Sequence, residues 1–201
     1  MRWWAIRTIG AAIAWVGATG LYAAVPDEGA ELIGTRAPQW DVTEWINGKL
    51  LSLDELRGSV VLVRWWTGPE CPYCAASAPN LNALYEQYHA KGLVVIGFYH
   101  HKSPTPLTRR YVEELVKRYR FQFPVAIDPE WRTLKRWWLE GYEHQWTSVS
   151  FLIDQQGVIR YIHPGGSYTE EDMAALTPLI EDLLVRPSPR HAASVSKEAE
   201  R

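Results

Sequence analysis

Two cysteines stand three residues apart in this sequence, and their type and spacing point most directly to chemistry. They are Cys71 and Cys74, in the run Cys-Pro-Tyr-Cys, and the 201-residue chain contains no other cysteine. A pair this close cannot clamp distant loops together as a structural disulfide framework does. The spacing therefore indicates reversible thiol chemistry rather than cross-linking.

The pair sits where a predicted buried strand ends and a predicted long helix begins. A helix N-terminus presents unpaired backbone N–H groups and the positive end of the helix dipole, and both favour a thiolate over a thiol at Cys71. Pro72 suits the first helical position, where no N–H is needed. Cys74 then lies one turn further in and is less exposed. The negative charge of Glu70 acts on Cys71 in the opposite direction.

This geometry assigns a role to each sulfur. Cys71 is expected to attack a substrate disulfide, and Cys74 to resolve the mixed disulfide and release reduced substrate. The reverse reaction uses the same atoms. The expected partners are protein thiols or disulfides and a second redox protein that resets the pair, and no cofactor or metal is expected.

Two other interpretations of the pair remain open. A structural zinc site needs four ligands, so two would have to come from histidines such as His100 and His101. The cysteines could also be an inert buried pair. Neither interpretation uses the predicted position at a helix N-terminus.

The residues before the pair predict the elements that lead into it. Segments 40–45 and 50–51 flank Asn47-Gly48, a strong turn signal, and so predict an N-terminal β-hairpin. Residues 52–55 form a Ser-x-x-Glu capping box that opens one short helical turn. The run Val-Val-Leu-Val at 60–63 predicts a central strand buried on both faces of a sheet.

After the pair, helical and strand patterns alternate, as expected for an α/β sheet of mixed direction. The expected elements are a helix from Cys74 to Gly92, a strand over 93–98, a helix over 107–119, a strand over 123–127, a helix over 131–138, a closing hairpin of 149–153 with 158–162, and a final helix over 169–185 capped by Thr169.

The N-terminus is typical of an export signal or membrane anchor. Arg2 and Arg7 precede a stretch without charge from Thr8 to Pro26, which is marginal in length for a bilayer core of about 30 Å. Positive charges favour the cytoplasmic side, so everything after Pro26 is expected outside the cytoplasm, on the periplasmic side. The predicted organisation is a signal peptide or anchor over 1–26, a linker over 27–36, one domain over 37–185 and a disordered tail over 186–201.

Charge composition argues against a polyanionic partner. The chain carries 21 Lys and Arg against 23 Asp and Glu. A near balance of this kind gives no sustained positive field for nucleic acid. No nucleic-acid partner is therefore expected.

Several motifs occur in a characteristic order: Ala37-Pro38-x-Trp40, the Asn47-Gly48 turn, Ser52-Leu53-x-x-Leu56-x-Gly58, the strand into Trp65-Trp66, the Cys-x-x-Cys pair, and Phe151-Leu152-Ile153-Asp154 before Gly157. With them the chain from Ala37 to about Val185 resembles the TlpA/ResA-like redoxins, which are exported or membrane-tethered proteins of the thioredoxin superfamily. Pro79 also matches the proline inside the superfamily's active-site helix.

The resemblance implies a thioredoxin-like α/β fold, in which helices flank a central mixed sheet with an N-terminal β-hairpin added. It implies the activity of an extracytoplasmic thiol–disulfide oxidoreductase, with Cys71 and Cys74 as catalytic residues. It further implies that a substrate groove near them is formed by Trp66, Pro72, Tyr73, Thr147 and Ser148.

Three positions depart from the family pattern. Ser148 stands where the family has a cis-proline, and a cis bond outside proline costs about 2.5 to 4 kcal/mol, so a trans peptide and an altered groove are expected. Ser77 replaces the ResA-type glutamate, which weakens the case for a role in cytochrome c maturation. The approach over 67–70 is one residue longer than usual, so Trp66 need not hold the family's position.

Two related activities fit the sequence less well. A peroxiredoxin-like peroxidase would have Thr and Pro where this chain has Gly68 and Arg64. A Sco-like copper chaperone shares the fold and lacks the cis-proline, but it uses a Cys-x-x-x-Cys spacing. Its distant histidine corresponds here to Trp146, with His144 two residues away.

Overall fold

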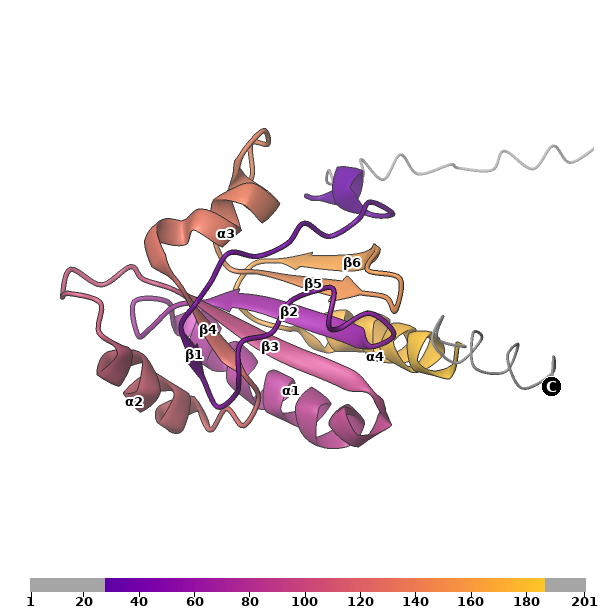
Figure 1. The fold of residues 1–201 in the computed structure, drawn as a ribbon, viewed down its shortest axis with the longest axis horizontal. Coiled ribbons are helices and arrows are strands. Elements are labelled where there is room, and N and C mark those ends of the chain that lie inside the picture. Colours follow the sequence, from indigo (N-terminus) through magenta and orange to yellow (C-terminus); the bar gives the residue numbers. More distant parts are fainter. Residues whose placement is uncertain (1–27, 187–201) are drawn as a thin grey trace, which may run out of the picture.

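The computed structural model describes residues 28–186, and a single six-stranded sheet organises them (Figure 1). The strand order is β1-β4-β3-β2-β5-β6. β2 pairs in parallel with β3, and β3 with β4, whereas the other neighbours are antiparallel, which confirms the predicted mixed sheet. The strands are β1 (Trp45–Ile46), β2 (Val60–Trp66), β3 (Leu93–His100), β4 (Val125–Asp128), β5 (Val149–Ile153) and β6 (Ile159–Pro164).

The two central strands are buried because helices and loops cover both faces of the sheet. All seven residues of β2 are buried, as the apolar run at its start predicts. Its register with β3 runs from Val60 opposite Leu93 to Trp66 opposite Tyr99. Parallel pairing brings the carboxyl ends of both strands to one edge of the sheet, and the cysteine pair follows the end of β2.

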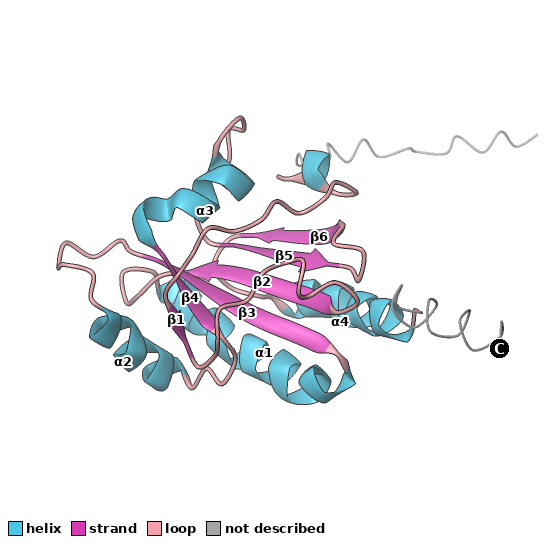
Figure 2. Cartoon of the chain, in the orientation of Figure 1, coloured by secondary structure: helices cyan, strands magenta, loops and turns pink. Residues whose placement is uncertain are grey.

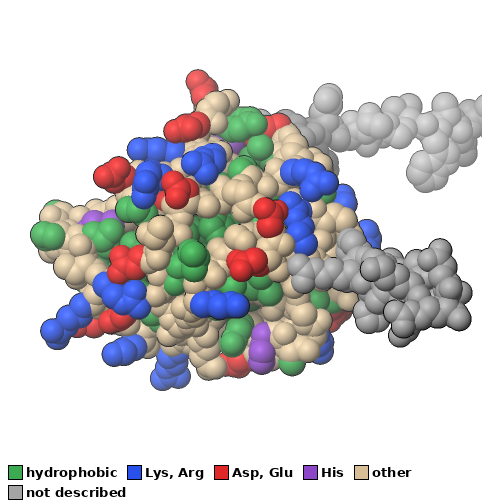
Figure 3. Space-filling model, viewed as in Figure 1, with side chains coloured by type: hydrophobic (Ala, Val, Ile, Leu, Met, Phe, Trp, Pro, Cys, Tyr) green, Lys and Arg blue, Asp and Glu red, His purple; other side chains and the backbone are tan. Residues whose placement is uncertain are grey.

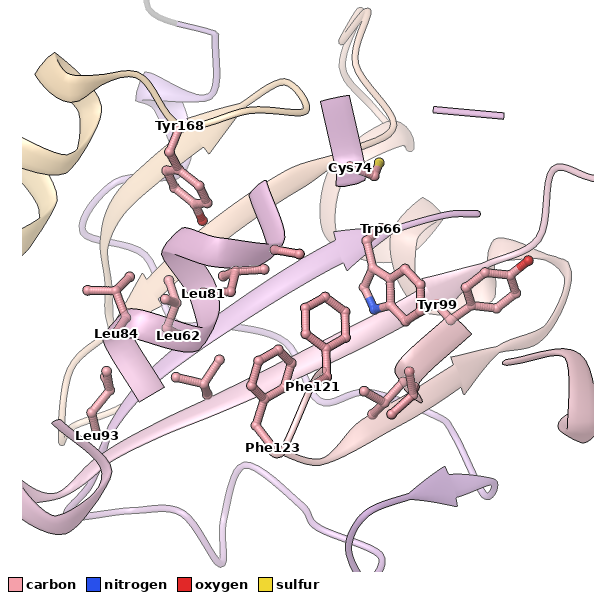
Figure 4. Close-up of a cluster of buried hydrophobic side chains, with 14 of the residues drawn as sticks. Leu62, Trp66, Cys74, Leu81, Leu84, Leu93, Tyr99, Phe121, Phe123 and Tyr168 are labelled. Atoms are coloured by element: carbon pink, nitrogen blue, oxygen red, sulfur yellow. The ribbon is translucent and has the colours of Figure 1, made fainter. Parts of the chain in front are cut away.

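Alternation of side chains along β2 divides the core into two clusters. Leu62 and Trp66 face one way and pack with apolar residues of the long helices, as Figure 4 shows for this cluster. Val63 and Trp65 face the other way, against the N-terminal segment and residues 131–139. Arg64 lies on the same face as Leu62, because side chains two apart in a strand point the same way.

The helices fall on both sides of the sheet (Figure 2). α1 (Pro72–Tyr88), α2 (Arg109–Tyr119) and α4 (Glu170–Val185) contribute to the cluster around Leu62. They confirm three predicted helices, with Pro79 inside α1. Thr169 caps α4 in a capping box with Asp172. Short 3₁₀ turns also occur at η1 (Ala30–Leu32) and η2 (His89–Lys91).

The helix predicted over 131–138 is divided into short segments. A 3₁₀ turn, η3 (Pro129–Trp131), precedes α3 (Arg132–Leu134) and a π-helical turn, η4 (Lys135–Leu139). Glu130 and Trp131 both adopt positive φ, at 56° and 61°, which interrupts a regular helix. The Asp128 carboxylate accepts hydrogen bonds of 2.9 Å from the backbone N–H groups of Thr133 and Leu134, and so satisfies two N–H groups of α3.

The predicted N-terminal β-hairpin is wrong. Trp45 and Ile46 pair with β4, and residues 49–52 form no strand. Asn47 takes a left-handed conformation with φ 57°, and its amide donates to the Phe121 carbonyl at 2.7 Å, which directs the chain along the sheet instead of back onto itself. The capping box is confirmed, because Ser52 N–H donates to Glu55 at 2.9 Å and Glu55 N–H donates to the Ser52 hydroxyl at 3.3 Å.

The segment before residue 37 packs along β6. Gly34 N–H donates to the Ile159 carbonyl at 2.8 Å, and Ile159 N–H donates to the Thr35 carbonyl at 2.9 Å. The division into a linker over 27–36 and a domain from residue 37 stays a prediction. The predicted anchor over 1–26 and the tail beyond Arg186 lie outside the described residues.

Residues 28–186 contain no helix with the length and hydropathy needed to cross a bilayer. On the face shown in Figure 3, acidic and basic side chains are intermixed. This distribution agrees with the small formal net charge of −2.

Candidate active site

Cys71 and Cys74 occupy the first turn of α1, at the carboxyl edge of β2. Cys71 is the N-cap residue, with an extended backbone (φ −121°), and Pro72 is the first helical residue. The Cys71 sulfur accepts a hydrogen bond from the Cys74 backbone N–H at 3.3 Å. The same N–H also donates to the Cys71 carbonyl at 3.1 Å, so the first turn of the helix holds this sulfur against its backbone.

The two sulfur atoms lie 2.7 Å apart and are not bonded to each other. A disulfide bond is about 2.05 Å long, so only a small movement separates this arrangement from the bridged one. Cys71 is partly exposed, whereas Cys74 is 1% exposed. One sulfur can therefore meet a partner from solvent, and the other can reach only its neighbour.

The environment of Cys74 holds it as a thiol. Burial raises the pKa of the Cys74 thiol, and the hydrogen bond to Cys71 raises it further. Contacts with the Ser148 hydroxyl and the Thr67 backbone act in the opposite direction, as does the positive charge of Arg64. Cys74 Sγ lies 3.1 Å from Ser148 Oγ. The net effect favours an uncharged Cys74 until it reacts.

Ser148 closes one side of the site. No cis peptide bond occurs within residues 28–186, so the predicted trans peptide at Ser148 is confirmed. The Ser148 carbonyl accepts a hydrogen bond from Gly165 N–H at 2.8 Å. This bond ties the segment before β5 to the turn after β6.

An open cavity of about 240 Å³ lies against the exposed side of Cys71. We call it the Cys71 groove, and its lining residues are Glu70, Cys71, Pro72, Tyr73, Lys102, Gln145, Trp146, Thr147, Ser148 and Gly166. The structure thus brings together four of the five residues predicted to contact substrate, namely Pro72, Tyr73, Thr147 and Ser148. Tyr73 is 56% exposed, and it borders the groove beside Gly166.

The substrate-contact role predicted for Trp66 does not fit its position. Trp66 is 1% exposed and does not line the groove. Its ring packs edge-on against Tyr99, Tyr119 and Phe121, at centroid distances of 5.1 to 5.7 Å. Figure 4 shows the indole directed into the cluster. Trp66 is a core residue, because β2 ends with this side chain pointing into the sheet face covered by α1 and α2.

Trp146 lines the groove, although the sequence predicted no substrate contact for it. It is 48% exposed, although it is a large aromatic side chain. The signal in the sequence that could have indicated this contact is its position two residues before Ser148, in a segment without helical or strand periodicity. Exposed aromatic residues beside a reactive group offer apolar contact to a bound chain.

Glu70 and Ser77 make contacts that account for their places near the pair. Glu70 hydrogen-bonds Tyr111 and, after burial, is a cause of the raised pKa of that phenol. The Glu70 carboxylate is thereby partly engaged by α2. The Ser77 hydroxyl is buried and donates to the Cys74 carbonyl at 2.8 Å. Ser77 therefore supports the helix backbone where ResA-type proteins have a carboxylate.

The histidines considered as metal ligands do not gather with the cysteines into a ligand set in the described part of the chain. His144 stacks on Trp138, and its two ring nitrogens contact the Trp138 carbonyl and Glu31. His100 is fully buried against Trp131, and burial, with Lys102 and Arg64, lowers its pKa to about 3. Within residues 28–186, no three His, Cys, Asp or Glu side chains gather as a metal site. Trp146, at the Sco histidine position, offers no ligand nitrogen.

Comparisons with known proteins agree with the geometry of the site. The family model described as Redoxin matches residues 33–177. The protein "Thiol-disulfide oxidoreductase ResA" of a Bacillus cereus strain is 33% identical over 63% of this chain and 66% of its own length, just under two thirds. The ResA of Bacillus thuringiensis subsp. konkukian is 33% identical over 70% of this chain and 74% of its own length.

Solved structures show the same architecture. A thioredoxin-like superfamily protein, SPOA0173, has a TM-score of 0.63 at 25% identity, and covers 77% of this chain and 99% of its own. A putative thiol:disulfide interchange protein DsbE from Chlorobium tepidum has a TM-score of 0.60 at 27% identity, over 76% of this chain and 97% of its own. The thioredoxin-like fold predicted from the motifs is therefore confirmed.

Proposed function

Because this chain belongs to the Redoxin family, we propose that it is an extracytoplasmic thiol–disulfide oxidoreductase that exchanges disulfides with protein thiols through Cys71 and Cys74. The observation that carries the proposal is the unequal pair at the start of α1. The sulfurs lie 2.7 Å apart, one open to the Cys71 groove and the other buried beneath it. The relatives named above are themselves called thiol–disulfide oxidoreductases.

In the reducing direction, the Cys71 thiolate attacks one sulfur of a substrate disulfide. A Cys71–substrate disulfide forms, and the other substrate sulfur leaves as a thiolate that takes a proton from water. Cys74 then loses its proton to solvent, and its sulfur attacks Cys71 Sγ. The second substrate sulfur leaves, the Cys71–Cys74 bond forms, and two electrons have passed to the substrate.

The Cys71 groove suits a protein segment as the substrate. Tyr73 and Trp146 give exposed aromatic surface beside the reactive sulfur. The groove is open and about 240 Å³ in volume, so it does not enclose a small molecule. A polypeptide carrying a disulfide can lie across it with one sulfur facing Cys71.

The extracytoplasmic location rests on the sequence before the domain. Arg2 and Arg7 precede the uncharged stretch from Thr8 to Pro26. Such a segment is exported or retained in the membrane with its basic end in the cytoplasm. Disulfide exchange with structural thiols is also the chemistry of oxidising compartments.

Reduction of insulin with dithiothreitol as electron donor tests the proposal. The wild-type protein should accelerate insulin precipitation, and Cys71→Ser should return the rate to that of dithiothreitol alone. Cys74→Ser should retain the attacking sulfur and accumulate a mixed disulfide with insulin that is visible on a non-reducing gel. Equal rates for wild type and Cys71→Ser would remove the proposed activity.

A further inference from the structure

Arg64 is a charged residue in the middle of a buried strand. It lies on β2, and its side chain is 0% exposed. None of the ion pairs within 4.0 Å among residues 28–186 includes it. Burying a guanidinium without a carboxylate partner destabilises the fold. Arg64 is therefore expected to offset this cost through its hydrogen bonds or to serve a function through its charge.

Hydrogen bonds hold the guanidinium next to the active site. Its Nη1 donates to the Gly165 carbonyl at 2.8 Å and to the Ser150 hydroxyl at 3.1 Å, and its Nη2 donates to the Gly166 carbonyl at 2.6 Å. The Tyr168 ring lies 5.5 Å from the guanidinium carbon. The Nε atom is buried with no hydrogen-bond partner.

A short chain of contacts connects Arg64 to the buried sulfur. Gly165 accepts from Arg64 through its carbonyl and donates through its N–H to the Ser148 carbonyl at 2.8 Å. The Ser148 hydroxyl in turn lies 3.1 Å from Cys74 Sγ. Arg64 also shares the face of β2 that packs against α1, so its charge and Cys74 lie on the same side of the sheet.

The positive charge of Arg64 lowers the pKa of Cys74, with an effect smaller than those of the Ser148 and Thr67 hydrogen bonds, and Lys102 lines the Cys71 groove beside Cys71. His163, near Arg64, has a pKa lowered by burial and by Arg64 itself, and His100 has a pKa lowered to about 3. Both are therefore uncharged at neutral pH. Cys71 and Tyr119 also face Cys74, and the pKa of Tyr119 is raised by burial and by Cys74.

We propose that Arg64 is a positioning residue of the exchange reaction, whose buried positive charge stabilises the Cys74 thiolate while Cys74 attacks the mixed disulfide on Cys71. The inference rests on the proposed function. In that step Cys74 loses its proton to solvent by way of the open groove at Cys71 and develops negative charge where its own side chain is 1% exposed. A fixed positive charge acts more strongly on a buried group than it would in bulk water. The same charge stabilises Cys74 as the leaving group in the reverse direction.

Ionisation of Cys74 can be measured without any substrate. In a Cys71→Ser background the chain has one cysteine, and its thiolate absorbance in the ultraviolet can be titrated against pH. Arg64→Gln keeps donor groups near Gly165 but removes the charge, so it should raise the pKa of Cys74 and lower its acid dissociation constant about threefold. Arg64→Lys keeps the charge and should leave the acid dissociation constant of Cys74 at the value of the background.

A second pair of variants leaves Arg64 in place. Ser150 already accepts from Nη1 at 3.1 Å, so Ser150→Asp would place a carboxylate beside the guanidinium and neutralise it. Ser150→Asp should lower the acid dissociation constant of Cys74 about threefold, as Arg64→Gln does, whereas Ser150→Asn, which has the same shape without the charge, should leave that constant unchanged. If the Arg64 variants do not fold, the two Ser150 variants still test whether the charge of Arg64 acts on Cys74.

The outcomes separate this inference from the proposed function. An unchanged Cys74 titration in both Arg64→Gln and Ser150→Asp overturns it, and so does an equal shift in Arg64→Gln and Arg64→Lys, which would leave Arg64 only a structural role. A charge-dependent titration in a protein that does not reduce insulin would support the electrostatic contact and reject the oxidoreductase activity.

Discussion

Ser148 Oγ lies 3.1 Å from Cys74 Sγ, at the position where the resembling family has a cis-proline. The contact puts a hydroxyl, in place of an apolar ring, against the buried sulfur. This hydroxyl lowers the pKa of Cys74, against the larger opposing effect of burial. At this position the chain therefore has a hydroxyl that contacts the reacting Cys74 sulfur, where the resembling family has the fixed backbone of a cis-proline.

Ser148→Ala should therefore raise the pKa of Cys74. Loss of one hydrogen bond to the thiolate, worth about 1 kcal/mol, should slow resolution of the mixed disulfide about fivefold at neutral pH. Stopped-flow measurement of resolution against pH would show the profile moved to higher pH. Ser148→Thr keeps the hydroxyl and is the matched control. A profile unchanged in Ser148→Ala would contradict the role of this contact.

Gly166→Ala should disturb Tyr73 directly. A Cβ at Gly166 would lie 2.1 Å from the Tyr73 Cβ, so the two segments must separate. Displacing the dipeptide between the cysteines should lower kcat/KM for insulin by about 10- to 100-fold.

Gly165→Ala is the control for that prediction. A Cβ at Gly165 meets nothing within 4 Å, but its φ of 102° makes alanine strained. It should cost about 1 kcal/mol or more of unfolding free energy while activity falls less than in Gly166→Ala. Equal activity losses would mean that backbone strain, and not contact with Tyr73, controls the site.

Trp66→Phe should lower stability and leave catalysis nearly unchanged. The ring is 1% exposed among Tyr99, Tyr119 and Phe121, so a smaller ring leaves a cavity there. The unfolding free energy should fall by about 1 to 3 kcal/mol in urea denaturation. A large rise in KM for insulin with normal stability would restore the substrate-contact role to Trp66.

Trp146→Ala, in contrast to Trp66→Phe, should weaken substrate binding and leave stability nearly unchanged. Its side chain is 48% exposed and lines the Cys71 groove, so truncation removes contact area for a substrate rather than core packing. KM for insulin should rise several-fold, by about 1 kcal/mol of binding or more, with a nearly unchanged midpoint of thermal unfolding. Reaction with a small disulfide reagent, which does not span the groove, should be unaffected.

His100 should make the fold sensitive to acid. Burial first, and then Lys102 and Arg64, lower its pKa to about 3 from an ordinary value of 6.5. The unfolded chain therefore binds a proton that the folded chain excludes, so His100 contributes stability above pH 6.5 that is lost as pH falls toward 3. His100→Phe, which keeps an aromatic ring against Trp131, should flatten urea-measured stability across this interval. An unchanged slope would mean that other groups control the acid response.

Most of the architecture could be predicted from the chain because it depends on local patterns. The buried run at residues 60–63 indicated the central strand, the Cys-Pro start indicated the N-terminus of α1, and the Thr169 box indicated the start of α4. Each of these signals acts within a few residues. The meeting of Pro72 and Tyr73 with Thr147 and Ser148 followed from the resemblance, since 74 residues separate Cys74 from Ser148 along the chain.

The features that could not be predicted from the sequence depend on tertiary contacts between residues far apart in the chain. Asn47-Gly48 favours a hairpin, but the Asn47 amide donates a hydrogen bond to the Phe121 carbonyl, and the strand that precedes Asn47 pairs with β4. Arg64 is the one charged residue of β2, and its three acceptors come from residues 150, 165 and 166. Nothing near it in sequence indicates those partners.

The different exposure of the two sulfurs has a practical consequence for following the protein's oxidation state. In the folded, reduced protein a bulky maleimide can reach Cys71 but not Cys74, which is 1% exposed. Native labelling should therefore add one tag, unfolding before labelling should add two, and oxidised protein should take none. A simple gel-shift ladder would then report the redox poise of the chain in its own compartment, since no other cysteine in the sequence competes for the reagent.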